Sequence, residues 1–86
     1  MSANLYAICN NPDTYMGLQL ASVSSQMAYS AHELSQALEN INSNADVVIL
    51  NTSLAKENTH ILEKYRDSNK GILFITIPDP QRNEDV

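Results

Sequence analysis

Cys9 is the side chain with the most reactive chemistry in this sequence, because a thiol at the end of a strand and before a helix can act as a nucleophile. A helix N-terminus beyond the thiol would lower its pKa. However, no arginine and no glycine-rich turn follows to hold a phosphate, and Pro12 removes one amide donor from the next helix. A small buried hydrophobic residue is therefore the preferred interpretation of Cys9, and a Cys9-dependent enzyme or phosphocarrier is the alternative.

The other reactive side chains do not combine into a recognisable site. His32 and His60 lie in different predicted helices, far from metal-ligand spacing. Gly17 falls well inside a helix instead of in a phosphate-binding turn. A phosphoacceptor site would need an aspartate where Asn51 ends the third strand, and Asp13 alone could not hold Mg²⁺. We therefore expect no catalytic residue, no cofactor and no metal.

Charge and composition restrict the classes of partner. The 86 residues carry ten Asp and Glu against five Lys and Arg, with a net charge of −5. Nucleic acids and anionic membranes need a basic surface, whereas a basic protein surface would suit this chain. No apolar run approaches the length of about 20 residues that spans a bilayer, and no secretory signal is evident. A single cysteine excludes an internal disulfide, so we expect a cytoplasmic protein without membrane insertion.

Alternating apolar and amphipathic segments predict a small α/β domain. The expected strands lie at about residues 5–9, 25–29, 45–50 and 72–77, with helices opening at Asn11, Ser30 and Thr52. Continuous apolar strands favour a mainly parallel sheet covered by helices on both faces. The prediction is a single doubly wound βαβαβαβ domain at residues 1–78, with strand order 2-1-3-4. Residues 79–86 are expected to form an irregular or disordered tail.

The second and third helices have recognisable starts and apolar sides. Ser30 and Glu33 fit a capping box. The apolar stripe that follows consists of Leu34, Ala37, Leu38 and Ile41. Thr52 is expected to cap one continuous third helix that stops near residues 69–71, with Asn58 as a polar exception on its apolar side.

The first helix divides into two sets of apolar residues. Met16, Gly17, Leu20 and Ala21 share one side at helical spacing. We expect this side to pack on the sheet, with Gly17 allowing a close approach of helix and strand. Tyr15 and Leu18 would then point away from the sheet, either toward a partner or beneath the C-terminal tail.

Four segments, in this order, resemble F subunits of V/A-type rotary ATPases. Residues 13–21 resemble the family's Asp-x-x-x-Gly-Phe-x-Leu-Ala segment after the first strand. Residues 48–55 are similar to its third strand with a Thr-x-x-Leu-Ala helix start. Residues 61–66 and 75–78 are similar to its Ile-x-x-Tyr-Arg helix end and its Ile-Pro turn. The resemblance covers residues 5–78, nearly the whole chain.

The resemblance implies a non-catalytic subunit of the central stalk, which is the shaft of the rotor. Such a subunit binds the coiled-coil D subunit inside the ring of catalytic A and B subunits, and ATP chemistry and ion movement belong to other subunits. On this basis the candidate interface residues are Asp13, Tyr15, Leu18 and Gln19.

The chain also departs from the family pattern. Cys9 and Asn10 stand where the family commonly has Gly-Asp, and Ser22 stands where it often has Gly. Family members continue past the Ile-Pro turn into a C-terminal helix linked to regulation, whereas eight residues follow Pro78 here, which argues against that regulatory role. A stand-alone receiver-like adaptor that binds proteins without phosphorylation is the alternative function.

Overall fold

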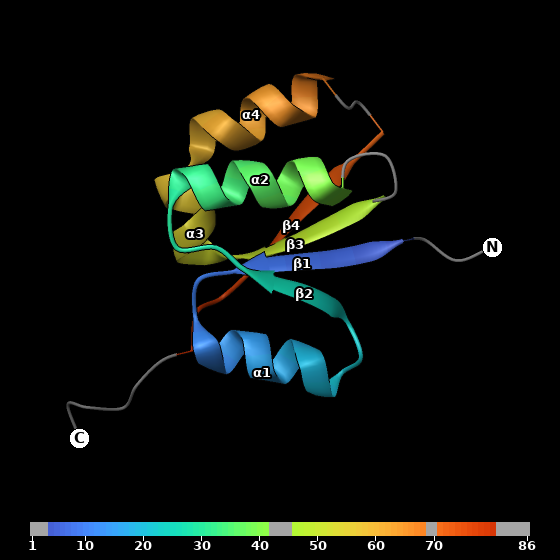
Figure 1. Cartoon of the computed structure of the whole chain (residues 1–86), viewed down its shortest axis with the longest axis vertical. Helices are drawn as coiled ribbons and strands as arrows, with labels where there is room; N and C mark the ends of the chain where they lie inside the picture. The colour runs from blue at the N-terminus through green and yellow to red at the C-terminus, as the bar shows by residue number, and fades with distance from the viewer. Residues whose placement is uncertain (1–3, 42–45, 69–70, 81–86) are drawn as a thin grey trace.

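The computed structural model describes residues 4–41, 46–68 and 71–80 (Figure 1). Its elements are β1 (Leu5–Cys9), α1 (Pro12–Leu20), β2 (Ser24–Met27), α2 (Ala31–Ile41), β3 (Val47–Asn51), α3 (Thr52–Glu57), α4 (Thr59–Ser68) and β4 (Leu73–Ile77). Residues 78–80 form neither helix nor strand, and the rest of the predicted tail lies outside the described residues. The division into a domain and a tail therefore stays a prediction.

The four strands form one parallel sheet in the order β2-β1-β3-β4. Helix α1 lies on one face, and α2, α3 and α4 lie on the other (Figure 1). The predicted α/β class, parallel pairing and strand order are confirmed. Continuous apolar strands lead to this arrangement because parallel strands are buried from both sides. Strand β4 occupies one edge of the sheet, where one row of its backbone groups has no neighbouring strand.

The main core lies between the sheet and the three helices α2, α3 and α4. The predicted apolar stripe of α2 is fully buried there, together with Ile8, Val48, Leu50 and Leu54. Half of the predicted capping box forms, because the Glu33 N–H donates to Ser30 Oγ. The Glu33 carboxylate accepts from the N–H of Tyr29, one residue before the cap, instead of from that of Ser30. The Tyr65 hydroxyl donates to the Leu38 carbonyl and so ties α4 to α2.

The predicted single third helix is wrong, because the chain breaks it into α3 and α4 at Asn58. Asn58 leaves helical geometry, with φ −132° and ψ 36°. Its buried side chain donates to the Leu54 carbonyl at 2.9 Å, and its own carbonyl accepts from the Leu62 N–H. The polar exception on the apolar side is thus the residue that ends one helix and opens the next.

The cap predicted for the third helix is also wrong. Thr52 is the first residue of α3, and its hydroxyl donates to the Ile77 carbonyl at 2.9 Å. The N–H of Ser53 in the first helical turn instead meets the Asp79 carboxylate, which arrives from beyond β4. The physical reason is that a carboxylate supplied by tertiary contact can satisfy a free N–H as well as a local side chain does.

Helix α1 packs on the sheet with the opposite side to the one predicted. Met16 is 63% exposed and Leu20 is 82% exposed. Thr14 is buried, while Tyr15 and Leu18 are half-buried. Apolar residues occur around the whole circumference of this nine-residue helix, so their spacing does not select one side. Short connections to β1 and β2 fix its rotation instead.

Gly17 does not mediate a close approach, in contrast to the prediction. It is exposed, and a Cβ atom at this position would meet no heavy atom within 4 Å. The left-handed backbone conformation that favours glycine occurs five residues after Gly17, at Ser22. Ser22 has φ 62°, and the Ser22 and Val23 N–H groups bond to the Gln19 and Leu18 carbonyls in a Schellman motif. This left-handed position explains why glycine suits it.

Candidate protein-interaction site

Asn51 organises the carboxyl edge of the sheet, which is where doubly wound proteins bind ligands. Its side chain is fully buried. Its Nδ2 lies at 2.7 Å from Asn10 Oδ1, 3.1 Å from Ser53 Oγ and 2.6 Å from Asp79 Oδ1. Its Oδ1 accepts from the Asn10 N–H at 3.0 Å. The amide therefore joins β1, β3, the start of α3 and the segment after β4.

Asp79 is the charged member of this network. Hydrogen bonds from Asn51 and Ser53, with help from the Lys56 charge, lower the pKa of Asp79 below its ordinary value, against a smaller opposing effect of burial. No buried polar side-chain atom among the described residues lacks a hydrogen-bond partner. The edge is thus filled by its own side chains, with the Asp79 carboxylate bound to the buried amide.

Cys9 lies in the sheet with its side chain fully buried. The Sγ atom is 3.8 Å from both the Gln26 carbonyl oxygen and Met27 Sδ. Burial raises the pKa of the Cys9 thiol, and the Asn11 backbone hydrogen bond offsets this only in part. The direction is opposite to that of an activated nucleophile. The interpretation of Cys9 as a buried hydrophobic residue is confirmed.

The two histidines lie on different helices. His32 on α2 and His60 on α4 are both exposed. Within residues 4–41, 46–68 and 71–80, no three His, Cys, Asp or Glu side chains come together as metal ligands would.

The four candidate interface residues do not share one exposed surface. Asp13 and Gln19 are exposed, whereas Tyr15 and Leu18 turn partly toward the sheet. The role of these four residues in binding stays a prediction. The half-buried positions of Tyr15 and Leu18 differ from the predicted outward orientation. The exposed apolar side chains of α1 are Met16 and Leu20 instead.

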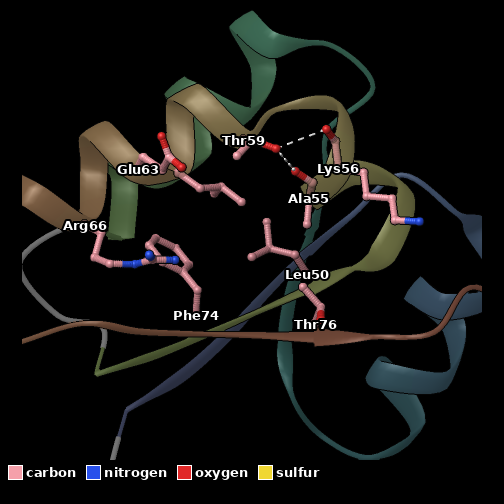
Figure 2. A pocket seen from close by; sticks show the side chains of 9 residues that line it. Leu50, Ala55, Lys56, Thr59, Glu63, Arg66, Phe74 and Thr76 are labelled. Carbon is pink, nitrogen blue, oxygen red and sulfur yellow. Dashed lines mark hydrogen bonds between the residues drawn. The ribbon is translucent and has the colours of Figure 1, made fainter.

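An open hollow of about 290 Å³ lies between β4 and the α3–α4 pair (Figure 2). Its lining residues are Leu50, Ala55, Lys56, Thr59, Leu62, Glu63, Arg66, Phe74 and Thr76. The Arg66 guanidinium lies 5.7 Å from the centroid of the Phe74 ring. At the start of α4, Thr59 Oγ1 donates to the Lys56 carbonyl of α3 at 3.2 Å. The lining combines apolar side chains with charged groups of both signs, namely Lys56, Glu63 and Arg66.

A surface feature that the sequence did not predict is the apolar exposure of β4. Leu73 is 55% exposed and Ile75 is 42% exposed, although both belong to a parallel strand. The sequence could have indicated this exposure. The segment Leu-Phe-Ile-Thr-Ile is apolar at almost every position, and the predicted strand order places it at an edge of the sheet. The Asn51–Asp79 contact had no local signal, because the two residues lie 28 positions apart.

Comparison with known proteins adds evidence on the family. The family model for the ATP synthase (F/14-kDa) subunit matches residues 5–86. The chain belongs to this family of F subunits. Because the family is one of ATP synthase subunits, a member works in a complex with other protein chains, and this agrees with the resemblance noted in the sequence.

A solved structure shows the same fold. The crystal structure of the F subunit of the V-type ATP synthase from Archaeoglobus fulgidus superposes with a TM-score of 0.64. The alignment has 23% sequence identity and covers 88% of this chain and 99% of that chain. None of the curated proteins compared with the chain matches it. No helix among the described residues has the length and apolar character needed to cross a membrane.

Proposed function

We propose that the chain is a non-catalytic subunit of the central stalk of a V/A-type rotary ATPase. In this role it binds the coiled-coil D subunit inside the A/B catalytic ring, on the cytoplasmic side of the membrane, and contributes to coupling ATP turnover to ion transport. The observation that carries the proposal is the family match over residues 5–86. The filled carboxyl edge around Asn51 and the raised pKa of the Cys9 thiol support a binding role over a catalytic one.

Helix α1 is proposed to take part in contact with the D subunit. Asp13 and Gln19 offer exposed polar groups at its two ends. Tyr15 and Leu18 are half-buried at the junction between this helix and the sheet, where they can add apolar contact at the border of an interface.

Co-expression with the D subunit of the same organism tests the proposal. Size-exclusion chromatography at micromolar concentration should give one peak that contains both chains, with a shared elution volume below that of either chain alone. An unrelated two-stranded coiled coil of similar length is the control and should elute separately. Separate elution of this chain and the D subunit would contradict the proposal.

A stand-alone receiver-like adaptor is the second candidate. Asn51 at the end of β3, in place of a phosphoacceptor aspartate, is the observation that favours it. This candidate predicts a complex with a signalling protein and no association with the D subunit, so the same chromatography separates the two functions.

A further inference from the structure

One face of the sheet has an uncovered apolar half. In β1, β3 and β4, successive side chains point to opposite faces, and those that join the main core are Tyr6, Ile8, Val48, Leu50 and Phe74. Their alternates point to the face that carries α1. We call the following six the open face: Leu5, Val47, Ile49, Leu73, Ile75 and Ile77. The register aligns them in rows, with Leu5 beside Val47 and Val47 beside Leu73.

Burial falls with distance from α1 in the row nearer the middle of the strands, whereas Leu5 at the start of β1 is itself 41% exposed. Helix α1 packs against β1 and β2. In the row Ala7–Ile49–Ile75, the first side chain is 1% exposed, the second is half-buried and the third is 42% exposed. Leu73 in the neighbouring row is 55% exposed. Thus α1 shields one half of this face and leaves the half formed by β3 and β4 in contact with solvent.

The exposed half ends at an unpaired strand edge. Strand β4 is the last strand of the sheet, and all five of its side chains are β-branched or large and apolar. Soluble proteins commonly protect such an edge with charges, prolines or a covering segment. No lysine or arginine lies in β4. Contiguous apolar exposure of this kind marks a contact site for another chain.

The described basic side chains lie away from the open face. The described Lys and Arg side chains are Lys56, Lys64 and Arg66, and all three belong to α3 and α4 on the opposite face. On the side of the open face, Asp13 lies exposed in the first turn of α1. A partner with basic residues beside an apolar stripe would complement this surface.

We propose that the open face is the docking surface for an amphipathic helix of a basic partner segment, whose apolar stripe covers Leu73 and Ile75. The inference rests on the proposed function, in which this helix belongs to the coiled coil of the D subunit. A five-residue strand is about 16 Å long, which matches about three turns of helix. Helices cover parallel sheets in this way within single domains, and here another chain would supply the missing one.

Two other occupants fit the surface less well. Residues 81–86 contain one apolar side chain, Val86, so they offer no apolar stripe. A second copy of this chain would bring two negatively charged chains together, because each copy carries a net charge of −5. A basic helix avoids both difficulties.

The test compares variants of the open face with a variant of an exposed residue outside the proposed contacts. Leu73→Ser removes an exposed leucine from the open face, and Ile75→Thr removes apolar surface while keeping the β-branched shape that suits a strand. Tyr29→Ser is the control, because it removes a large side chain that is 64% exposed and lies in the connection before α2, outside both the open face and α1. Affinity for the D subunit is measured by calorimetric titration. We expect each open-face variant to weaken binding at least about tenfold and the control to change it less than about twofold.

Circular dichroism melts first establish that each variant is folded. If Leu73→Ser does not fold, the binding measurement is made with Ile75→Thr alone. Unchanged affinity of folded open-face variants for a D subunit that binds the wild type would overturn the docking surface and leave the proposed function standing. If the D subunit does not bind even the wild-type chain, both are overturned. A wild-type dimer that Leu73→Ser converts to a monomer would assign the surface to a second copy and overturn the basic-helix proposal.

A charge measurement provides the second readout. Asp13 is exposed and lies outside the hydrogen-bond network of the carboxyl edge. Asp13→Asn should slow association with the D subunit and reduce the dependence of the association rate on salt. Its melting temperature should fall only slightly, because the variant loses a carboxylate that stabilises the first turn of α1. An association rate that increases with salt for the wild type would show a repulsive border and contradict a basic partner.

Discussion

The two faces of the sheet differ in how completely the chain covers them. On one face, α2, α3 and α4 enclose a core whose side chains are almost entirely buried. On the other face, α1 covers β1 and β2, while Leu73 and Ile75 remain exposed on β4. The closed face holds most of the buried apolar surface and so contributes most of the stability. The open face is available for binding at little cost in folding.

The helices on the two faces differ in the same way. Helix α2 buries one well-defined stripe, and its four apolar members all face the sheet. Helix α1 leaves Met16 and Leu20 in solvent and buries Thr14. A helix with one apolar side has one way to pack, whereas a helix with apolar residues all around depends on its connections.

Leucine truncation on the two helices should give the largest contrast. Leu38→Ala on α2 removes a fully buried side chain and should lower the free energy of unfolding by about 2–5 kcal/mol. Leu20→Ala on α1 should change it by less than about 0.5 kcal/mol, because Leu20 is largely in solvent. Urea denaturation measures both values. Equal losses would show that the two faces contribute alike to stability, contrary to the comparison.

Disruption of the hydrogen bonds of Asn51 at the carboxyl edge of the sheet should cause the second-largest loss of stability, because the Asn51 side chain is buried. Asn51→Asp replaces the amide donor with a carboxylate beside Asp79 and should destabilise the fold by about 2–3 kcal/mol at pH 7. The double variant Asn51→Asp/Asp79→Asn restores an amide opposite a carboxylate and is the matched control. It should recover part of the loss in the same urea experiment. Failure of the exchange to recover any stability would mean that the contact does not depend on donor and acceptor pairing.

Acid should weaken the same network through Asp79. The folded-state pKa of Asp79 is lowered, so its contribution is fully present above the unfolded value of about 3.9 and is lost as the pH falls through the folded-state pKa. At neutral pH the wild type should therefore melt at a higher temperature than Asp79→Asn, and the gap should shrink below about pH 4. Melts at pH 7, 4 and 3 provide the measurement. A gap that persists unchanged at pH 3 would exclude a charge-dependent role.

Gly17→Ala should give the smallest effect, and it should be stabilising. The position is exposed and a Cβ atom would meet nothing within 4 Å, so the higher helix propensity of alanine should add about 0.5–1 kcal/mol. Thermal and urea unfolding can both detect this change. A loss of stability would restore the original expectation that Gly17 is needed for close packing of α1 on the sheet.

The sequence by itself determined the features that depend on local pattern. Continuous apolar segments specify parallel buried strands, the α2 stripe specifies its packing side, and Asn11 with Pro12 specifies the start of α1. Right-handed connections place helices on both faces of a parallel sheet, and the order 2-1-3-4 was expected by analogy with common doubly wound folds. The strands, the stripe and the helix start follow from residues that are close in the chain.

Tertiary structure decided what no local pattern could. The rotation of α1, the break at Asn58 and the cap that Asp79 supplies to α3 depend on partners brought together by folding. The candidate site shows the same limit, since four residues chosen on one helix separated into exposed and half-buried pairs. The physical reason is that burial depends on which surfaces meet, and apolar residues on every side of a helix leave that choice to the rest of the fold.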